Sequence, residues 1–400
     1  MRKAFFTGTH RTRHPGETWT VLRPLLTGYG ITRVADVTGL DGLGIPVTMA
    51  VRPLARTLSV AQGKGATLDA ARVSGALEAV EAWHGERAVP PVVERAPAEA
   101  LRLSYPVTAL DTHPGSLLTS RTVLDWITAR SAVDGTPVLV PAACVRLGRQ
   151  TQGRWRLHLP SASTNGLASG NTLGEAVAHA LYEVIERDAV SDLTGPAAPE
   201  GCPVRIEAGS VSDPHCAALI ERVHQAGAWL ELWHLPSRFG VPVMSAYLWR
   251  EDHAAFLVSG SGAHLDPHVA LSRAITEAAQ SRLTAIAGSR EDVHPATYRE
   301  AEHQGPAAAA DPGADWGPIA SRYAAGFDTH DREAAHLAAR IESVTGVAPL
   351  VVDLTHGPYE TGVFSVVKVV APGLRYDARH VIPRPRPDRT SVPARQEAAA

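Results

Sequence analysis

Carboxylates recur at helical spacing along the 400-residue chain. In a helix expected over residues 67–86, Ser74, Glu78 and Glu81 are separated by four and then three positions, so they share one face. One glutamate pair of this kind is most often a solvated helix surface. A second helix with the same pattern is therefore needed before the spacing can suggest a metal site.

A helix expected over residues 172–193, with Thr172 as its N-cap, repeats the pattern. Glu175, Glu183 and Glu186 lie close to one stripe, and Arg187 follows them. Mg²⁺ prefers oxygen ligands and leaves room for phosphate oxygens, and an arginine can bind a phosphate through two hydrogen bonds. The two helices suggest a site for Mg²⁺ and a nucleotide triphosphate, but the spacing alone is equally compatible with two solvated faces.

A third helix is expected over residues 267–287. Glu277 and Gln280 can face the same way there, whereas Arg282 points away from Glu277 on an ideal helix. The glycine-rich segment 63–67 lacks the earlier glycine and the spacing of a Walker A loop. A nucleotide site in this chain is therefore not expected to be a P-loop.

The elements that must position these helices are mostly short strands. Helices and strands alternate without the regular rhythm of parallel crossover units, which favours an α+β fold with helices packed on mixed or antiparallel sheets. Loops are expected at residues 90–106, 161–171 and 304–316. Strands are expected at residues 31–36, 45–52, 137–145, 154–159, 229–235, 241–249, 350–352 and 362–370.

The overall composition is that of a soluble globular protein. Hydrophobic residues make up 44% and charged residues 20%, and the net charge of −3 gives no sign of a nucleic-acid or membrane partner. The three cysteines form no CxxC pair, which favours a reducing, cytoplasmic location. No run of about 18 apolar residues exists that would predict a transmembrane helix.

The local sequences around the three helices resemble the signature blocks of the YcaO family, in order. Residues 62–81, 163–189 and 276–292 carry the resemblance, and residues 366–373 resemble the closing strand of the family. The resemblance extends over nearly the whole chain. We expect a single YcaO domain over residues 1–387, with residues 1–60 as its strand-rich N-terminal part and residues 388–400 as a flexible tail.

The resemblance also implies the residues of the site, with ATP and Mg²⁺ as cofactors. It identifies no catalytic base. It implies that Mg²⁺ is bound by Glu78, Glu81, Glu183 and Glu186, with Glu175 nearby, and that ATP is contacted by Arg11, Thr18, Ser74, Asn171, Arg187 and Arg282.

Members of this family share one activation step, which the resemblance implies for this chain. A nucleophile adds to a peptide amide carbon, the resulting oxyanion takes the γ-phosphate of ATP, and phosphate then leaves. Phosphate is a far better leaving group than hydroxide, so the protein contributes placement and charge neutralisation. The product is an azoline, a thioamide or an amidine, according to the nucleophile.

The N-terminal segments favour thioamide formation. Residues 7–11, 17–18, 30–35 and 38–41 resemble the members that work with a TfuA partner protein, which supplies sulfur. In addition, we expect no fused peptide-recognition or ThiF-like domain before the first helix. We therefore expect a homodimeric enzyme that thioamidates a ribosomal precursor peptide with a TfuA-type partner.

Several alternatives stay open. Residues 383–387 match the PxPxP pattern of azoline formers, but there it normally ends the chain, and here residues 388–400 follow. A peptide-binding scaffold without chemistry is disfavoured by the intact carboxylate set. His264 and His268 at i, i+4 give a weak zinc hypothesis, and Cys144 in an apolar strand is expected to be a buried, inert thiol.

Overall fold

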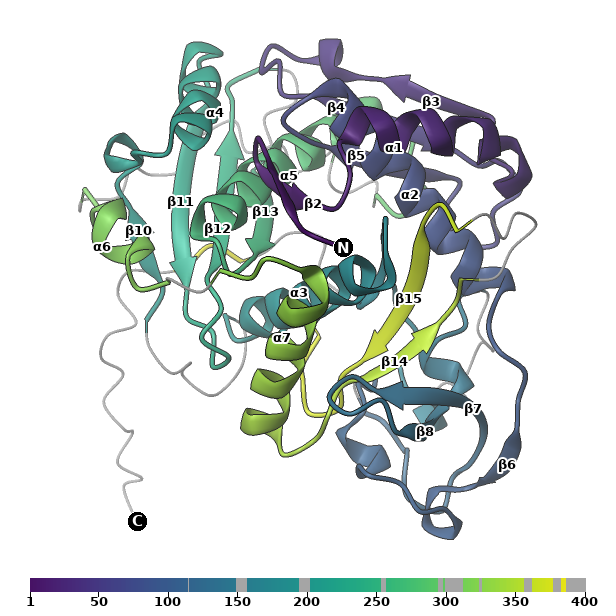
Figure 1. Ribbon diagram of the computed structural model, residues 1–400. Coiled ribbons are helices and arrows are strands. Elements are labelled where there is room, and N and C mark those ends of the chain that lie inside the picture. Colours follow the sequence, from purple (N-terminus) through teal and green to yellow (C-terminus); the bar gives the residue numbers. More distant parts are fainter. Residues whose placement is uncertain are drawn as a thin grey trace, which may run out of the picture.

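The computed structural model shows an α+β molecule in which the named strands pair only in antiparallel fashion, which confirms the predicted fold class (Figure 1). Among the described residues the strands form four sheets, of two, three, four and six strands. The structure describes residues 1–113, 115–148, 157–193, 202–252, 257–293, 298, 312–323, 326–355, 362–376 and 383–385.

The N-terminal part consists of a hairpin, a helix and a three-stranded sheet. The hairpin strands are β1 (Ala4–Phe6) and β2 (Thr9–Arg11), followed by α1 (Pro15–Leu22). The sheet, in the order β3-β4-β5, is covered by α2. Its elements are β3 (Arg33–Asp36), β4 (Val47–Val51), β5 (Val60–Lys64) and α2 (Leu68–Arg87).

Helix α2 lies unusually close to β5, because Gly63 of the strand has no side chain. A methyl group at Gly63 would overlap the carbonyl oxygen of Ala71 and the amide nitrogen of Gly75 on the helix. This close approach sets the depth at which the carboxylates of α2 stand beside the sheet.

The six-stranded sheet has the order β6-β7-β14-β15-β9, with β8 paired to β7. Helices α3 and α7 pack on each other, and α3 packs on β9 and β15. The elements are β6 (Glu94–Pro97), β7 (Val123–Ser131), β8 (Pro137–Pro141), β9 (Leu167–Gly170), β14 (Leu350–Asp353), β15 (Ser365–Val370), α3 (Leu173–Ser191) and α7 (His330–Thr345).

The four-stranded sheet, β10-β11-β12-β13, has α4 and α5 packed against it. Side chains of its strands also share a core with α3 and α7, so these two helices lie between the two larger sheets (Figure 1). The elements are β10 (Val204–Ile206), β11 (Trp229–Leu235), β12 (Val243–Trp249), β13 (Val258–Ala263), α4 (Pro214–Gln225), α5 (Pro267–Ala287) and α6 (Trp316–Ala320).

The three helices expected from the sequence agree closely with α2, α3 and α5, whereas α4 and α7 were not expected. Helix α3 begins after Thr172, whose side chain accepts a hydrogen bond from the amide of Glu175, as the expected N-cap should. Helix α5 has the expected bounds, and the expected strands at 229–235 and 241–249 pair as β11 and β12.

Several of the sequence-based predictions for short elements were wrong. The expected loop at 161–171 contains β9, and the expected loop at 90–106 contains β6. The expected strand at 137–145 ends at Pro141 and continues as a 3-10 turn. In a strand of four residues the pairing partner, here β15 for β9, decides the conformation and local propensity does not.

Some expectations fall wholly or partly outside the described residues. Of the strand expected at 154–159, only residues 157–159 are described, and they form no strand. Most of the loop expected at 304–316 and the whole tail expected at 388–400 lie outside the described residues. The single-domain division stays a prediction.

Candidate active site

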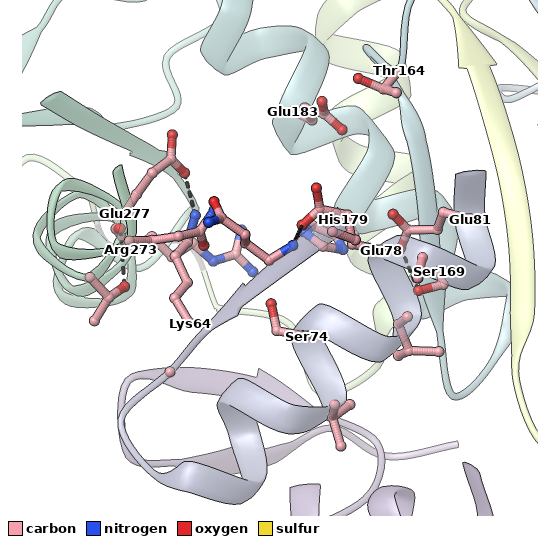
Figure 2. A pocket seen from close by; sticks show the side chains of 18 of the residues that line it. Lys64, Ser74, Glu78, Glu81, Thr164, Ser169, His179, Glu183, Arg273 and Glu277 are labelled. Atoms are coloured by element: carbon pink, nitrogen blue, oxygen red, sulfur yellow. Dashed lines mark hydrogen bonds and ion pairs between the residues drawn. The ribbon is translucent and has the colours of Figure 1, made fainter. Parts of the chain in front are cut away.

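A cavity of about 730 Å³ opens where α2, α3, α5, β5, β9 and the N-terminal segment meet. Figure 2 shows Glu78 and Glu81 of α2 and Glu183 of α3 around this space, with Lys64 and Glu277 paired to one side. The cavity therefore gathers carboxylates that are far apart in the sequence.

Helices α2 and α3 both present their predicted stripes to the cavity. From α2 come Ser74, Glu78 and Glu81. From α3 come the four side chains Glu175, His179, Glu183 and Glu186, which repeat at four, four and three positions, together with Arg187. The two helices thus bring together all the carboxylates that the sequence assigned to Mg²⁺.

Helix α5 contributes a stripe that the sequence reasoning used only in part. Arg273, Glu277, Gln280 and Thr284 line the cavity at i, i+4, i+7 and i+11. The sequence assigned neither Arg273 nor Glu277 to the site, although this helical spacing was a signal that could have found both.

Arg282 does not line the cavity with the other predicted ATP contacts. Its guanidinium is 1% exposed and forms ion pairs with Asp41, at 3.4 Å from Nε to Oδ2, and with Asp252. It lies on the side of α5 away from Glu277, as an ideal helix requires. In this structure Arg282 ties α5 to the loop that carries Asp41.

Four of the cavity carboxylates hold their protons unusually strongly. Burial, with smaller contributions from the neighbouring Glu78 and Glu183, raises the pKa of Glu81 to about 8. Burial likewise raises the pKa of Glu183 to about 7, with added repulsion from Glu186. The pKa values of Glu78 and Glu186 are also raised, chiefly by burial. Carboxylates confined in this way favour a cation among them.

Glu277 differs from these four carboxylates, because two cations flank it. Burial alone would raise its pKa, but the Lys64 ammonium and the Arg187 guanidinium outweigh burial and lower it. Arg187 itself has a buried Nε atom with no hydrogen-bond partner in the described part of the chain. An unsatisfied guanidinium N–H beside the cavity suits a phosphate oxygen.

This donor set fits Mg²⁺ together with a triphosphate. Carboxylate oxygens are the hard ligands that Mg²⁺ prefers, and the cationic side chains suit phosphate. Within the described residues no three His, Cys, Asp or Glu side chains stand together as a ready-made cage. Mg²⁺ commonly uses one or two carboxylates plus phosphate oxygens and water, so the arrangement matches a nucleotide-bridged site.

Glu175 has a different environment from the other carboxylates. It accepts hydrogen bonds from the amide of Thr12, at 2.9 Å, and from Asn171 Nδ2, at 3.1 Å, and Arg11 Nη1 lies 3.8 Å away. Thr18 donates to Asn171 at 2.8 Å. Burial would raise the pKa of Glu175, but Arg11 and the Thr12 hydrogen bonds lower it. Glu175 thus holds the N-terminal segment against α3.

The zinc hypothesis gains no support, and Cys144 is buried as expected. His264 is buried and stacks on Tyr182, and the described residues provide no third metal ligand beside His264 and His268. Burial raises the pKa of the Cys144 thiol to about 12, as expected for an inert side chain.

The family assignment follows from a match over most of the chain. A family model described as YcaO cyclodehydratase, ATP- and Mg²⁺-binding, matches residues 62–375, which include α2, α3 and α5. This chain belongs to the YcaO family. The resemblance seen in the sequence is therefore confirmed, and so are ATP and Mg²⁺ as the cofactors of this YcaO protein.

Relatives and a solved structure extend the comparison. An uncharacterised protein of Mycobacterium tuberculosis is 43% identical over 298 residues, which is 73% of this chain but only 65% of that relative. A Rhizobium leguminosarum bv. trifolii protein, described as lying in the tfuA 3′ region, is 37% identical over 385 residues, with 91% and 88% coverage.

The structure of YcaO from Methanopyrus kandleri, bound with AMPPCP and Mg²⁺, is 25% identical to this chain. The match covers 94% of this chain and 95% of the Methanopyrus chain, with a TM-score of 0.67. Separately, no helix in the described ranges of this YcaO protein is both long and apolar enough to cross a membrane.

Proposed function

We propose that this YcaO protein uses ATP and Mg²⁺ to phosphorylate the oxygen of a peptide backbone amide, and that the product is a thioamide. The observation that carries the proposal is the cavity in which carboxylates from α2 and α3 face cationic side chains from α3, α5 and β5. ATP supplies the phosphate and Mg²⁺ neutralises its charge, as in other phosphoryl transfers.

The roles proposed for the residues follow their surroundings. Carboxylates whose pKa values are raised by burial are proposed to hold Mg²⁺, and polar or cationic side chains that line the same cavity are proposed to hold ATP. The Mg²⁺ set is Glu78, Glu81, Glu183 and Glu186, with Glu175 beside it. The ATP set is Arg11, Thr18, Ser74, Asn171 and Arg187, to which we add Arg273.

Thioamide formation is supported by the Rhizobium relative. Its description places it beside tfuA, and the match spans nearly the whole of both chains. We propose a TfuA-type partner that delivers a sulfide equivalent to the amide. The sulfur adds to the amide carbon, the resulting oxyanion takes the γ-phosphate of ATP, and the former amide oxygen then leaves with the phosphate as the carbon–sulfur double bond forms. We also propose that the enzyme is a cytoplasmic homodimer whose substrate is a ribosomal precursor peptide.

A cyclodehydratase that forms azolines is the second candidate, and the family description names that activity. The start of the PxPxP segment is anchored to the four-stranded sheet. Arg384 forms a bidentate ion pair with Glu231, at 2.7 and 2.6 Å, and Tyr247 donates to the carbonyl of Pro383. An amidine product, or a scaffold without chemistry, has no comparable observation in its favour.

Intact mass spectrometry distinguishes the products. A candidate precursor peptide is incubated with this protein, its TfuA-type partner, ATP, Mg²⁺ and sulfide. A gain of about 16 Da, from oxygen to sulfur, supports the thioamide. A loss of about 18 Da indicates cyclodehydration instead. Glu183→Gln is the control, because a mass change that persists in this variant would not come from the proposed site.

A further inference from the structure

One buried carboxylate outside the cavity gathers an unusual number of donors. Glu333 on α7 is 1% exposed. It accepts hydrogen bonds from Lys3 Nζ at 2.8 Å, from the Tyr182 hydroxyl at 2.7 Å and from His330 Nδ1 at 3.0 Å. These donors outweigh burial and lower the pKa of Glu333 to about 2. A buried charge is retained only when partners compensate it, so these contacts must form together.

The Lys3 contact fixes the beginning of the N-terminal arm, which we define as residues 3–18. The amide of Lys3 also donates to the carbonyl of Asp328 at 2.8 Å, and Arg2 forms a β-bridge with Thr329 just before α7. Lys3 itself is 2% exposed at its side chain. The arm is therefore tied to the N-terminal end of α7 by both backbone and charge.

The other part of the arm is tied to α3. Glu175 accepts the amide of Thr12, and Arg11 lies beside the same carboxylate. Between the two attachments, His10 of β2 lies 3.4 Å from Asp266 and packs edge-on against His264. The arm is thus held along its length by residues of α3, of α7 and of the segment just before α5.

His330 connects the two attachment points. Its Nδ1 atom contacts Glu333, while its Nε2 atom lies 3.9 Å from Glu175 Oε2 and has no hydrogen-bond partner among the described residues. The imidazole therefore stands between the carboxylate that holds Lys3 and the carboxylate that holds Thr12.

We infer that Glu333 is a positioning residue, which through Lys3 and His330 holds the N-terminal arm against α3 and so presents Arg11 and Thr18 to the nucleotide. The arm also supplies Thr7, Thr9 and Arg13 to the wall of the cavity, although Glu333 itself does not touch the cavity. The inference rests on the proposed function, since it takes this wall to be part of the ATP site.

The test compares Glu333→Gln with Lys3→Met and with Glu342→Gln, the same substitution elsewhere on α7. Without nucleotide, hydrogen–deuterium exchange at the β1 and β2 amides is expected to be about tenfold faster in the first two variants. With Mg²⁺, the Kd of a fluorescent ATP analogue is expected to rise about tenfold. The maximal rate of ATP hydrolysis at saturating ATP is expected to stay within about twofold, and Glu342→Gln is expected to match the wild type.

Unchanged exchange in the arm of both variants would overturn the inference, and so would a lost maximal rate with unchanged nucleotide affinity. If Glu333→Gln does not fold, Lys3→Met decides, because it removes only the contact made by the arm. Suppose that the wild type binds no ATP analogue while the variants still exchange faster. That result would support the attachment of the arm, but it would refute both the positioning role and the proposed function. If only the inference is wrong, the wild type still binds the analogue.

Discussion

At the scale of single residues, Glu183 shows that a side chain of the site can lower the stability of the fold. Burial and the nearby Glu186 raise the pKa of Glu183 to about 7. Above that pH the protein without metal must therefore hold a buried negative charge that is not fully compensated. We expect Glu183→Gln to raise the melting temperature of the metal-free protein by about 1–3 °C at about pH 8. The same change removes a proposed Mg²⁺ ligand and is expected to abolish ATP hydrolysis.

Differential scanning fluorimetry and a phosphate-release assay check both halves of this expectation. Glu342→Gln on α7 provides the matched control and is expected to change neither quantity. A variant that loses stability and keeps its activity would place Glu183 outside the metal site.

Two arginines of α5 allow a second test at this scale. Arg273 lines the cavity, whereas Arg282 is buried between Asp41 and Asp252. We expect Arg273→Met to weaken binding of a Mg²⁺–ATP analogue about tenfold. We expect Arg282→Met to lower the free energy of unfolding by about 3 kcal/mol, because it leaves buried Asp41 without its cation.

Isothermal titration calorimetry and denaturant melts separate the two effects. The affinity of folded Arg282→Met is expected to equal that of the wild type. A tenfold loss of affinity in that variant would restore Arg282 to the ATP contacts implied by the family resemblance.

At the scale of elements, the contact between β5 and α2 sets where Glu78 and Glu81 stand. A methyl group at Gly63 would overlap the backbone of α2, so the helix would have to move. We expect Gly63→Ala to destabilise the fold by about 1–3 kcal/mol and to weaken Mg²⁺-dependent nucleotide binding. Gly39→Ala is the matched control, since no atom lies within 4 Å of its added methyl group. Equal melting temperatures for the two variants would contradict the close packing.

At the scale of the whole molecule, the cavity lies where three hydrophobic cores meet. Each carboxylate-bearing helix buries its apolar side in a different core and turns its polar side to the cavity. The first core includes Ala76 and Val80 of α2, the second Leu181 and Ile185 of α3, and the third Ala274 and Ala278 of α5. A ligand that bridges the helices should therefore stabilise the entire fold.

The dependence of this stabilisation on pH has a definite sign. The pKa of Glu81 is raised to about 8 and that of Glu183 to about 7, so the folded protein holds protons that the unfolded chain has lost. Unfolding then releases protons, and the metal-free protein becomes less stable as the pH rises from about 5 to 8. Mg²⁺ replaces those protons, so its binding is tighter at higher pH.

We therefore expect Mg²⁺ with a non-hydrolysable ATP analogue to raise the melting temperature more at about pH 8 than at about pH 6. Removal of the metal with EDTA is expected to cancel most of the effect of the nucleotide. A thermal shift that is equal at both pH values, or that survives EDTA, would count against carboxylate-bound Mg²⁺ in this cavity.

The sequence by itself determined the three helices that carry the site, the N-cap of α3 and two of the three polar stripes. Helical periodicity is a local property, so Thr172 as N-cap and the Glu78–Glu81 and Glu183–Glu186 pairs could be predicted before any contact was known. The same local blocks were enough to identify the family.

Only the tertiary structure decided which side of α5 enters the site and what holds the N-terminal arm. Helical spacing places Arg273 on the side of Glu277 and Arg282 on the other side, but only the packing of α5 shows which of the two sides faces the cavity. Lys3 and Glu333 meet across 330 positions of the chain. No local pattern encodes such a contact, because it forms only when α7 and the arm pack on α3 from opposite ends of the sequence.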